Sequence, residues 1–239
     1  MRLQPNTGIL LESLHGCAGK QLEATALLEV LEHVRATYDI KEILSDVIDE
    51  PLWMDVVLAH SYRHSNNFDK FVIDSLSEFG MKLRLHVWWD AADACVKSSI
   101  HNHPWDFASS LLIGSITMRR FEESTASKNT YTRMDCPTMA RSDRPLMSVA
   151  QADVGLACIG SDYFDAGMLY CLSHTVVHSV AHRGITATLV LQGQHLTDTT
   201  AVYVESLHEI ESPSAVRRFT REEALSKLCR LQGVLAKGG

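Results

Sequence analysis

The sequence lacks the features that mark several large classes of protein. None of its six cysteines forms a C-x-x-C pair, which argues against a cysteine-ligated zinc site. No apolar run approaches the roughly 18 residues needed to span a membrane. Lys and Arg number 22 against 29 Asp and Glu, and the resulting net charge of -7 repels nucleic-acid phosphates. We therefore expect neither a membrane nor a nucleic acid as a partner.

The first residues, MRLQPNTGILLESLHGC, also have little of an export signal. They hold one arginine and only a broken apolar stretch, whereas a signal peptide needs a basic start and a continuous apolar run. Without such a signal, reduced thiols are the expected state of the cysteines. We predict a cytoplasmic protein.

The two ends of the chain show helical periodicity. Apolar residues recur at helical spacing in residues 20–38, 40–47 and 52–59. Near the C-terminus, Thr220 and Glu223 have the spacing of a capping box, and an apolar stripe follows them. The sequence therefore predicts N-terminal helices and one C-terminal helix.

The middle of the chain is a series of short β-rich runs separated by Gly, Ser, Asp or Asn. The runs are residues 71–76, 81–89, 109–114, 115–122, 168–172, 177–180, 186–193 and 201–206. The polar stretch 122–150 is expected to be a long loop or a weak hairpin. Many short strands without intervening helices favour an all-β sandwich or barrel.

These patterns divide the 239 residues into three parts. We expect an N-terminal helical segment over residues 1–67 that packs on a barrel of residues 68–210, followed by a C-terminal helix within residues 211–239. No linker suggests two independent domains.

Twelve histidines are many for this length, and two of them lie at an informative spacing. His101 and His103 are two residues apart in a strand context, so alternation places both on one face. Two imidazoles converging from one strand suit a metal ion. The same spacing also fits two surface or capping histidines.

The surroundings of this pair resemble the first motif of the cupin superfamily. That motif has a glycine, an H-x-H pair, a glutamate and a second glycine at fixed intervals. His101, His103 and Gly114 match it, while Cys95 replaces the first glycine and Phe107 replaces the glutamate.

The second cupin motif is also partly present. Gly167 and His178 match at the required interval. Ser173, Thr175 and His182 stand where the family has a proline, a glycine and an asparagine. The resemblance covers roughly residues 70–205.

The resemblance implies a mainly β fold, the cupin double-stranded β-helix or jelly-roll barrel, with His101, His103 and His178 as ligands of one divalent metal ion. Iron(II) is favoured, and zinc, nickel or manganese are open alternatives. Without the glutamate, three neutral imidazoles leave the metal charge uncompensated, which favours anionic or bidentate substrates. Cupins often pair through sheet edges, so the resemblance also allows a homodimer.

Within the superfamily, the chain is most similar to the cysteine dioxygenase group. The run from Ser98 to His103 and the placing of Tyr170 eight residues before His178 fit that group. The group's Ser-x-His-x-Tyr strand falls instead on Thr188, Val190 and Gln192. The string H-x-H-P-W-D-F is also similar to a set of bacterial cupins.

Several other side chains are candidates for the site. Lys82, Arg84, His86 and Trp88 share one strand face, so Arg84 could bind a substrate carboxylate if that face lines the barrel, whereas the alternative is a solvated face. Tyr170 could donate a hydrogen bond to oxygen at the metal or be a core tyrosine. Asp106 or His174 could join the metal, although His174 fits a solvated turn better. Further candidates are His182 as a structural or supporting residue, Trp105 as a wall of the site or as simple barrel packing, and Arg119 and Arg183 as weaker anchors.

Three functions follow from these residues. The leading one is a mononuclear non-haem iron(II) dioxygenase that acts on a small anionic or chelating metabolite with O2. The second is a non-redox metal cupin, that is, an isomerase, lyase or hydrolase. The third is a cupin that binds a small molecule without turnover.

Overall fold

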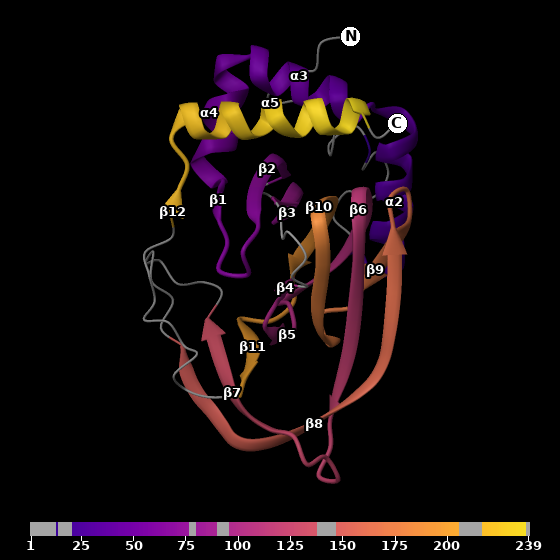
Figure 1. Cartoon of the computed structure of the whole chain (residues 1–239), viewed down its shortest axis with the longest axis vertical. Helices are drawn as coiled ribbons and strands as arrows, with labels where there is room; N and C mark the ends of the chain where they lie inside the picture. Colours follow the sequence, from indigo (N-terminus) through magenta and orange to yellow (C-terminus); the bar gives the residue numbers. More distant parts are fainter. Residues whose placement is uncertain are drawn as a thin grey trace.

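The computed structural model describes residue 13 and residues 21–76, 80–89, 96–137, 147–205 and 217–237. It is mainly antiparallel β, with helices at the two ends of the chain that gather on one side of the strands (Figure 1). The predicted fold class, a β-barrel with N-terminal helices and a C-terminal helix, is confirmed.

The helices begin where their capping residues allow. They are α2 (Ala24–Thr37), α3 (Ile40–Asp49), α4 (Pro51–His60) and α5 (Arg221–Lys237). The Asp39 carboxylate accepts the N–H of Lys41 at the start of α3, and Pro51 occupies the first turn of α4, where no N–H is needed. The capping box before α5 is confirmed, because Thr220 and Glu223 exchange side-chain and backbone bonds of 3.1 Å.

The strands range from two to 19 residues in length. They are β1 (Tyr62–Arg63), β2 (Asp69–Leu76), β3 (Met81–Trp88), β4 (Val96–Lys97), β5 (Ile100–His101), β6 (Trp105–Glu123), β7 (Thr130–Pro137), β8 (Ser148–Asp165), β9 (Leu169–Leu172), β10 (Val177–His195), β11 (Thr199–Val204) and β12 (Arg217–Arg218).

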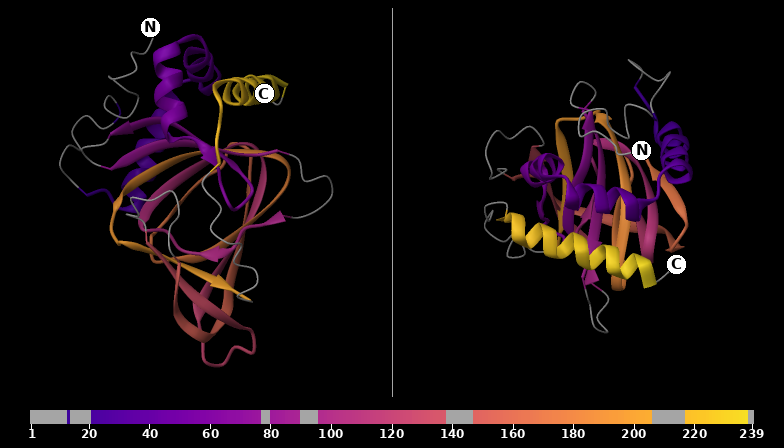
Figure 2. Two further views of the ribbon diagram at one scale, coloured as in Figure 1. Left: turned by 90° about the vertical axis from the view of Figure 1, so that its left-hand side faces the viewer. Right: turned by 90° about the horizontal axis from the view of Figure 1, so that it is seen from above.

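Six strands close into a ring. β10 pairs with β5, and the pairing continues through β11, β7, β8 and β6 back to β10. From β10 the sheet also extends through β3, β2 and β1 to β12, while β9 borders β6. β7 and β8 form the end of the molecule remote from the helices (Figure 2). The closed ring is the barrel that the sequence predicts.

The longest strands differ from the prediction. The runs 109–114 and 115–122 join in β6, and the runs 177–180 and 186–193 join in β10. Both strands bend where their register shifts between Arg183 and Ala187. Gly114 lies at this bend with φ +76, and a Cβ there would meet Ile185 O at 2.6 Å, so the position requires glycine.

In its described part, the polar stretch 122–150 forms a hairpin and not a long loop, because β7 pairs with β8. The prediction missed β8 itself. Most side chains of β8 are exposed, and its sequence is rich in Ala, Gly and Ser. Only Val154 and Leu156 are buried apolar residues at alternate positions, so the strand has little hydrophobic alternation.

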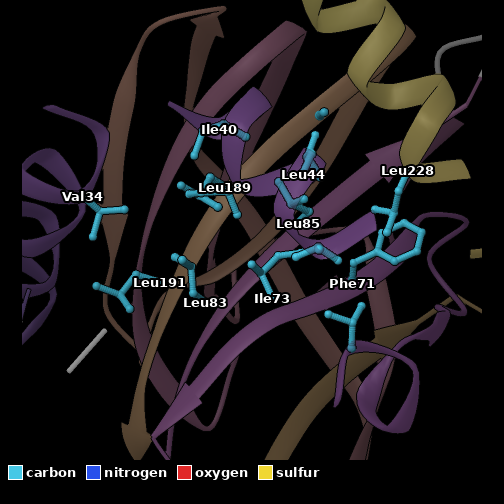
Figure 3. Packing of buried hydrophobic residues seen from close by; sticks show 14 of the residues in the cluster. Val34, Ile40, Leu44, Phe71, Ile73, Leu83, Leu85, Leu189, Leu191 and Leu228 are labelled. Carbon is cyan, nitrogen blue, oxygen red and sulfur yellow. The ribbon is translucent and has the colours of Figure 1, made fainter. Parts of the chain in front are cut away.

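The main core lies outside the barrel, between the helices and one face of β2, β3 and β10. Leu83, Leu85, Leu189 and Leu191 project from the strands toward apolar side chains of the helices (Figure 3). α2 packs on β6, β9 and β10, whereas α4 packs on β2 and α3 packs on α5. Two smaller apolar clusters lie elsewhere in the barrel.

None of the helices in the described ranges combines the length and the apolar character that crossing a bilayer requires.

Candidate metal centre

Three histidines converge from two neighbouring strands. His101, His103 and His178 each offer one ring nitrogen, and these three atoms all lie within 4.8 Å of one another. The ring centroids are 4.8–5.1 Å apart. In the part of the chain that the structure describes, no carboxylate or thiol joins this cluster.

The barrel itself brings the third ring to the first two. His101 on β5 and His178 on β10 are direct cross-strand partners. His103 follows β5 after one residue, and Asn102 between them exchanges bonds with the backbone of Ala201 on β11, at 3.1 and 2.7 Å. The segment therefore stays extended beyond the strand, and both histidines keep the same side.

The closed antiparallel ring and the cluster of three histidines agree with the fold and the ligands that the resemblance to the cupin superfamily implies.

Comparison with known proteins adds no finer assignment. No protein-family model and no curated protein matches the sequence. Among solved structures, the fold is similar to a hydroquinone 1,2-dioxygenase in complex with Cd2+ and 4-hydroxybenzonitrile, at 11% identity over 52% of this chain and 62% of the other, with a TM-score of 0.33. A hydroquinone 1,2-dioxygenase from Sphingomonas sp. TTNP3 with 4-hydroxybenzoate bound gives 9% identity over 48% and 60%, with a TM-score of 0.30.

The oxalate decarboxylase of Bacillus subtilis, which has Mn(II) centres, gives 10% identity over 59% of this chain and 29% of the other, with a TM-score of 0.35. The chain thus spans about three-fifths of the length of the two dioxygenases. At these values the similarities carry no argument about substrate or metal.

Hydrogen bonds to backbone carbonyls determine which ring nitrogen of His101 and of His178 can bind a metal ion. Nδ1 of His101 lies 2.8 Å from the carbonyl of Ser99, and Nδ1 of His178 lies 3.2 Å from the carbonyl of Val176. A carbonyl only accepts, so each Nδ1 carries the proton and each Nε2 keeps its lone pair. Such second partners are typical of metal-binding histidines, so these two rings fit a metal ion.

Burial keeps the three imidazoles neutral. It lowers the pKa of His178 to about 3 and that of His103 well below its usual value, with the neighbouring histidines adding to both shifts. Burial also lowers the pKa of His101, although its bond to Ser99 opposes the shift. Neutral rings are the form that binds a cation.

A loop far away in the sequence holds the Ser99 carbonyl in place. Oδ1 of Asn66, between β1 and β2, accepts the N–H of Ser99 at 3.3 Å and its hydroxyl at 3.0 Å. The hydroxyl of Ser98 donates to the same carbonyl at 3.1 Å. Asn66 therefore orients His101 through Ser99, a contact across 33 residues that sequence periodicity cannot reveal.

Aromatic rings surround the cluster. Trp105 stacks on His103 with centroids 5.4 Å apart, and Phe107 meets His103 edge-on at 5.1 Å. Phe107, at the position of the family's glutamate, therefore forms an apolar wall beside the three nitrogens. The interpretation of Trp105 as a wall of the site agrees with this geometry.

The structure places Arg84 on the inside of the barrel. Its side chain is 5% exposed, and its guanidinium carbon lies 4.8 Å from the centroid of Trp105. The alternative of a solvated strand face is therefore wrong, because this face of β3 turns toward the barrel interior. Arg119 and Arg183, the weaker anchor candidates, are exposed.

Tyr170 lies near the cluster but not against it. Its ring stacks on Phe164 at 4.4 Å and meets Phe107 edge-on at 6.1 Å, while Phe107 in turn lies 6.3 Å from His178. Burial raises the pKa of Tyr170 to about 12, so its hydroxyl stays protonated.

Asp106 and His174 pair with each other instead of joining the cluster. Oδ1 of Asp106 accepts the backbone N–H of His174 and lies 2.7 Å from its Nδ1. This pair closes the turn that leads into β10. His182 is buried against Trp88, with centroids 5.4 Å apart, as a supporting residue would be.

Proposed function

We propose that this chain is a metal-dependent cupin enzyme, and specifically a mononuclear non-haem iron(II) dioxygenase that acts on a small anionic or chelating metabolite. His101, His103 and His178 would hold the metal. The observation that carries the proposal is the convergence of three neutral histidine nitrogens within 4.8 Å, without a carboxylate among the described residues.

The donor set favours a particular kind of ligand. Three imidazoles on one side leave the remaining coordination positions to water or substrate and leave the charge of a divalent ion uncompensated. An anionic chelating substrate would supply that missing charge. Iron(II), when bound, would supply the redox route to O2 and hold both reactants together.

The protein's own residues would bind and orient the substrate. Phe107 and Trp105 would keep water from one side of the reacting groups. Arg84 would attract an anionic group of the substrate toward the barrel interior. Tyr170, protonated and behind Phe107, would donate a hydrogen bond to a part of the substrate away from the histidines.

Metal analysis tests the centre. We expect protein purified under anaerobic conditions to contain about one divalent ion per chain, and we expect His101→Ala and His178→Ala to lose it, since a site with two ligands binds a metal much more weakly. His33→Ala, which alters an exposed histidine on α2, is the matched control. Full metal content in both cluster variants would disprove the site.

Oxygen uptake tests the reaction class. We expect iron-loaded protein to consume O2 only with its substrate, in a screen of small chelating acids followed by an oxygen electrode. Zinc-loaded protein should consume none. A native content of zinc, nickel or manganese, with turnover but no O2 uptake, would instead establish a non-redox cupin enzyme, and binding without product would establish a binding protein.

A further inference from the structure

The inner face of β2 and β3 gathers positive charge. Lys70 lies opposite His86, and Val72 lies opposite Arg84, so Lys70 and Arg84 are diagonal neighbours on adjacent strands. Lys82 is two residues before Arg84 on the same face. Within the described part of the chain, no ion pair involves any of these three cations.

Arg84 is the unusual member of this group. It is 5% exposed, and its Nε has no hydrogen-bond partner among the described residues. The Trp105 ring covers one face of the guanidinium. A ring in this position does not accept hydrogen bonds from the N–H groups, because these lie in the plane of the guanidinium. A buried charge without a partner is costly, so such a group is retained where a ligand satisfies it.

Lys70 and Tyr62 add donors beside Arg84. Tyr62 on β1 is the direct partner of Lys70, and Nζ of Lys70 lies 2.9 Å from the Tyr62 hydroxyl. Burial lowers the pKa of Lys70 well below its usual value, with Arg84 and Lys82 adding to the shift. An anion would reverse this crowding of like charges. Lys70, Tyr62 and Lys82 remain partly exposed, so an anion from solvent can reach them.

The aromatic contacts connect this group to the histidines. The Arg84 guanidinium stacks on Trp105, and Trp105 stacks on His103. The cations therefore lie beside the metal centre but are separated from it by one indole ring. A ligand that reaches both must carry an anionic group at some distance from the atoms at the histidines.

We propose that Arg84, Lys70 and Tyr62 form a second subsite that binds a doubly charged oxyanion group, such as a phosphate or phosphonate, at the end of the substrate remote from the histidines. Two close cations with Lys82 behind them match a dianion better than a single carboxylate. Several N–H and O–H donors likewise match an oxyanion with three oxygens. This inference deepens the proposed function, because it names the substrate class of the same site.

The test uses inorganic phosphate as the probe, with acetate at equal ionic strength as the single-charge comparison. Binding is measured by calorimetry and by the thermal midpoint. We expect phosphate to bind wild type at least about tenfold more tightly than acetate, and to bind Arg84→Gln and Lys70→Gln at least about tenfold more weakly than wild type. Arg183→Gln, which alters an exposed arginine, should bind as wild type does.

Two further measurements separate this proposal from its alternatives. His178→Ala should lose the metal but keep phosphate binding. Metal binding and phosphate binding are therefore measured separately, and either proposal can fail while the other holds. In buffer without phosphate, Arg84→Gln should melt no lower than wild type, because it removes an uncompensated charge. Equal binding of phosphate and acetate, equal binding by all variants, loss of phosphate binding with His178→Ala, or a lower midpoint for Arg84→Gln alone would each overturn the proposal.

Discussion

The two faces of β3 hold opposite kinds of residue. Leu83 and Leu85 lie on the outer face, under the helices, and are at most 1% exposed. Arg84 and His86 lie on the inner face, where each has a polar atom without a partner among the described residues. The helix–sheet layer therefore stabilises the fold, whereas the inner face holds the polar groups that we propose bind a ligand.

Truncating the outer face should have the largest effect. Leu85→Ala removes buried methyl groups from the core and leaves a cavity, so we expect the free energy of unfolding to fall by about 2–5 kcal/mol. Urea denaturation measures this change, and Leu52→Ala, at a side chain that is 68% exposed, should shift it by less than about 0.5 kcal/mol. The metal content of folded Leu85→Ala should remain that of wild type. Lost metal with unchanged stability would contradict the division between the faces.

Acid should lower the free energy of unfolding of the metal-free protein, because His178 inside the barrel is buried in its neutral form. The pKa of His178, which is 2% exposed, is lowered to about 3 in the folded state, whereas the unfolded chain titrates near 6.5. The unfolded state therefore binds the proton first, and stability falls as pH falls below 6.5, by about 2 kcal/mol from this residue at pH 5. Denaturation of chelator-treated wild type and His178→Leu at pH 7.5 and pH 5 measures the difference. Identical losses in the two proteins would exclude this contribution.

Removing the remote support of His101 should weaken metal binding without unfolding the protein. Asn66→Ala deletes the acceptor that fixes Ser99, and we expect about tenfold weaker binding of zinc in a competition titration. Asn66→Asp keeps an acceptor oxygen and should restore most of the affinity. Asn129→Ala, in a surface turn, is the control. Unchanged affinity in Asn66→Ala would show that the bonds to Ser99 do not position the ring.

The sequence predicts the fold through patterns that are local. Strand alternation separates Leu83 and Leu85 from Arg84, and the capping spacing of Thr220 and Glu223 locates the start of α5. His101 and His103 are singled out by their spacing, whereas His178 is found only through the resemblance to the second cupin motif. Their use as metal ligands, with Tyr170 and Arg84 as substrate-binding residues, stays a prediction.

What the sequence could not predict depends on contacts between distant segments. Alternation shows that Arg84 and His86 share a face, but the same pattern describes a face in water and a face inside a polar barrel. The burial of Arg84 follows only from contacts with distant segments, such as the Trp105 ring that packs on its guanidinium. The support of His101 by Asn66, and the pairing of Lys70 with Tyr62, likewise need the register of β1, β2 and β5, which no single run of residues contains.

The smallest effect on stability is expected at His86, the residue directly after Leu85. His86 packs between Phe68 and Trp88, with centroids 4.4 and 6.2 Å away, and its buried Nε2 has no partner among the described residues. His86→Leu keeps a similar volume and removes that polar atom, so we expect the free energy of unfolding to change by less than about 1 kcal/mol, toward higher stability. Urea denaturation beside Leu85→Ala measures both faces of one strand. A loss of several kcal/mol in His86→Leu would mean that the inner face also stabilises the fold, and the contrast between the two faces of β3 would then fail.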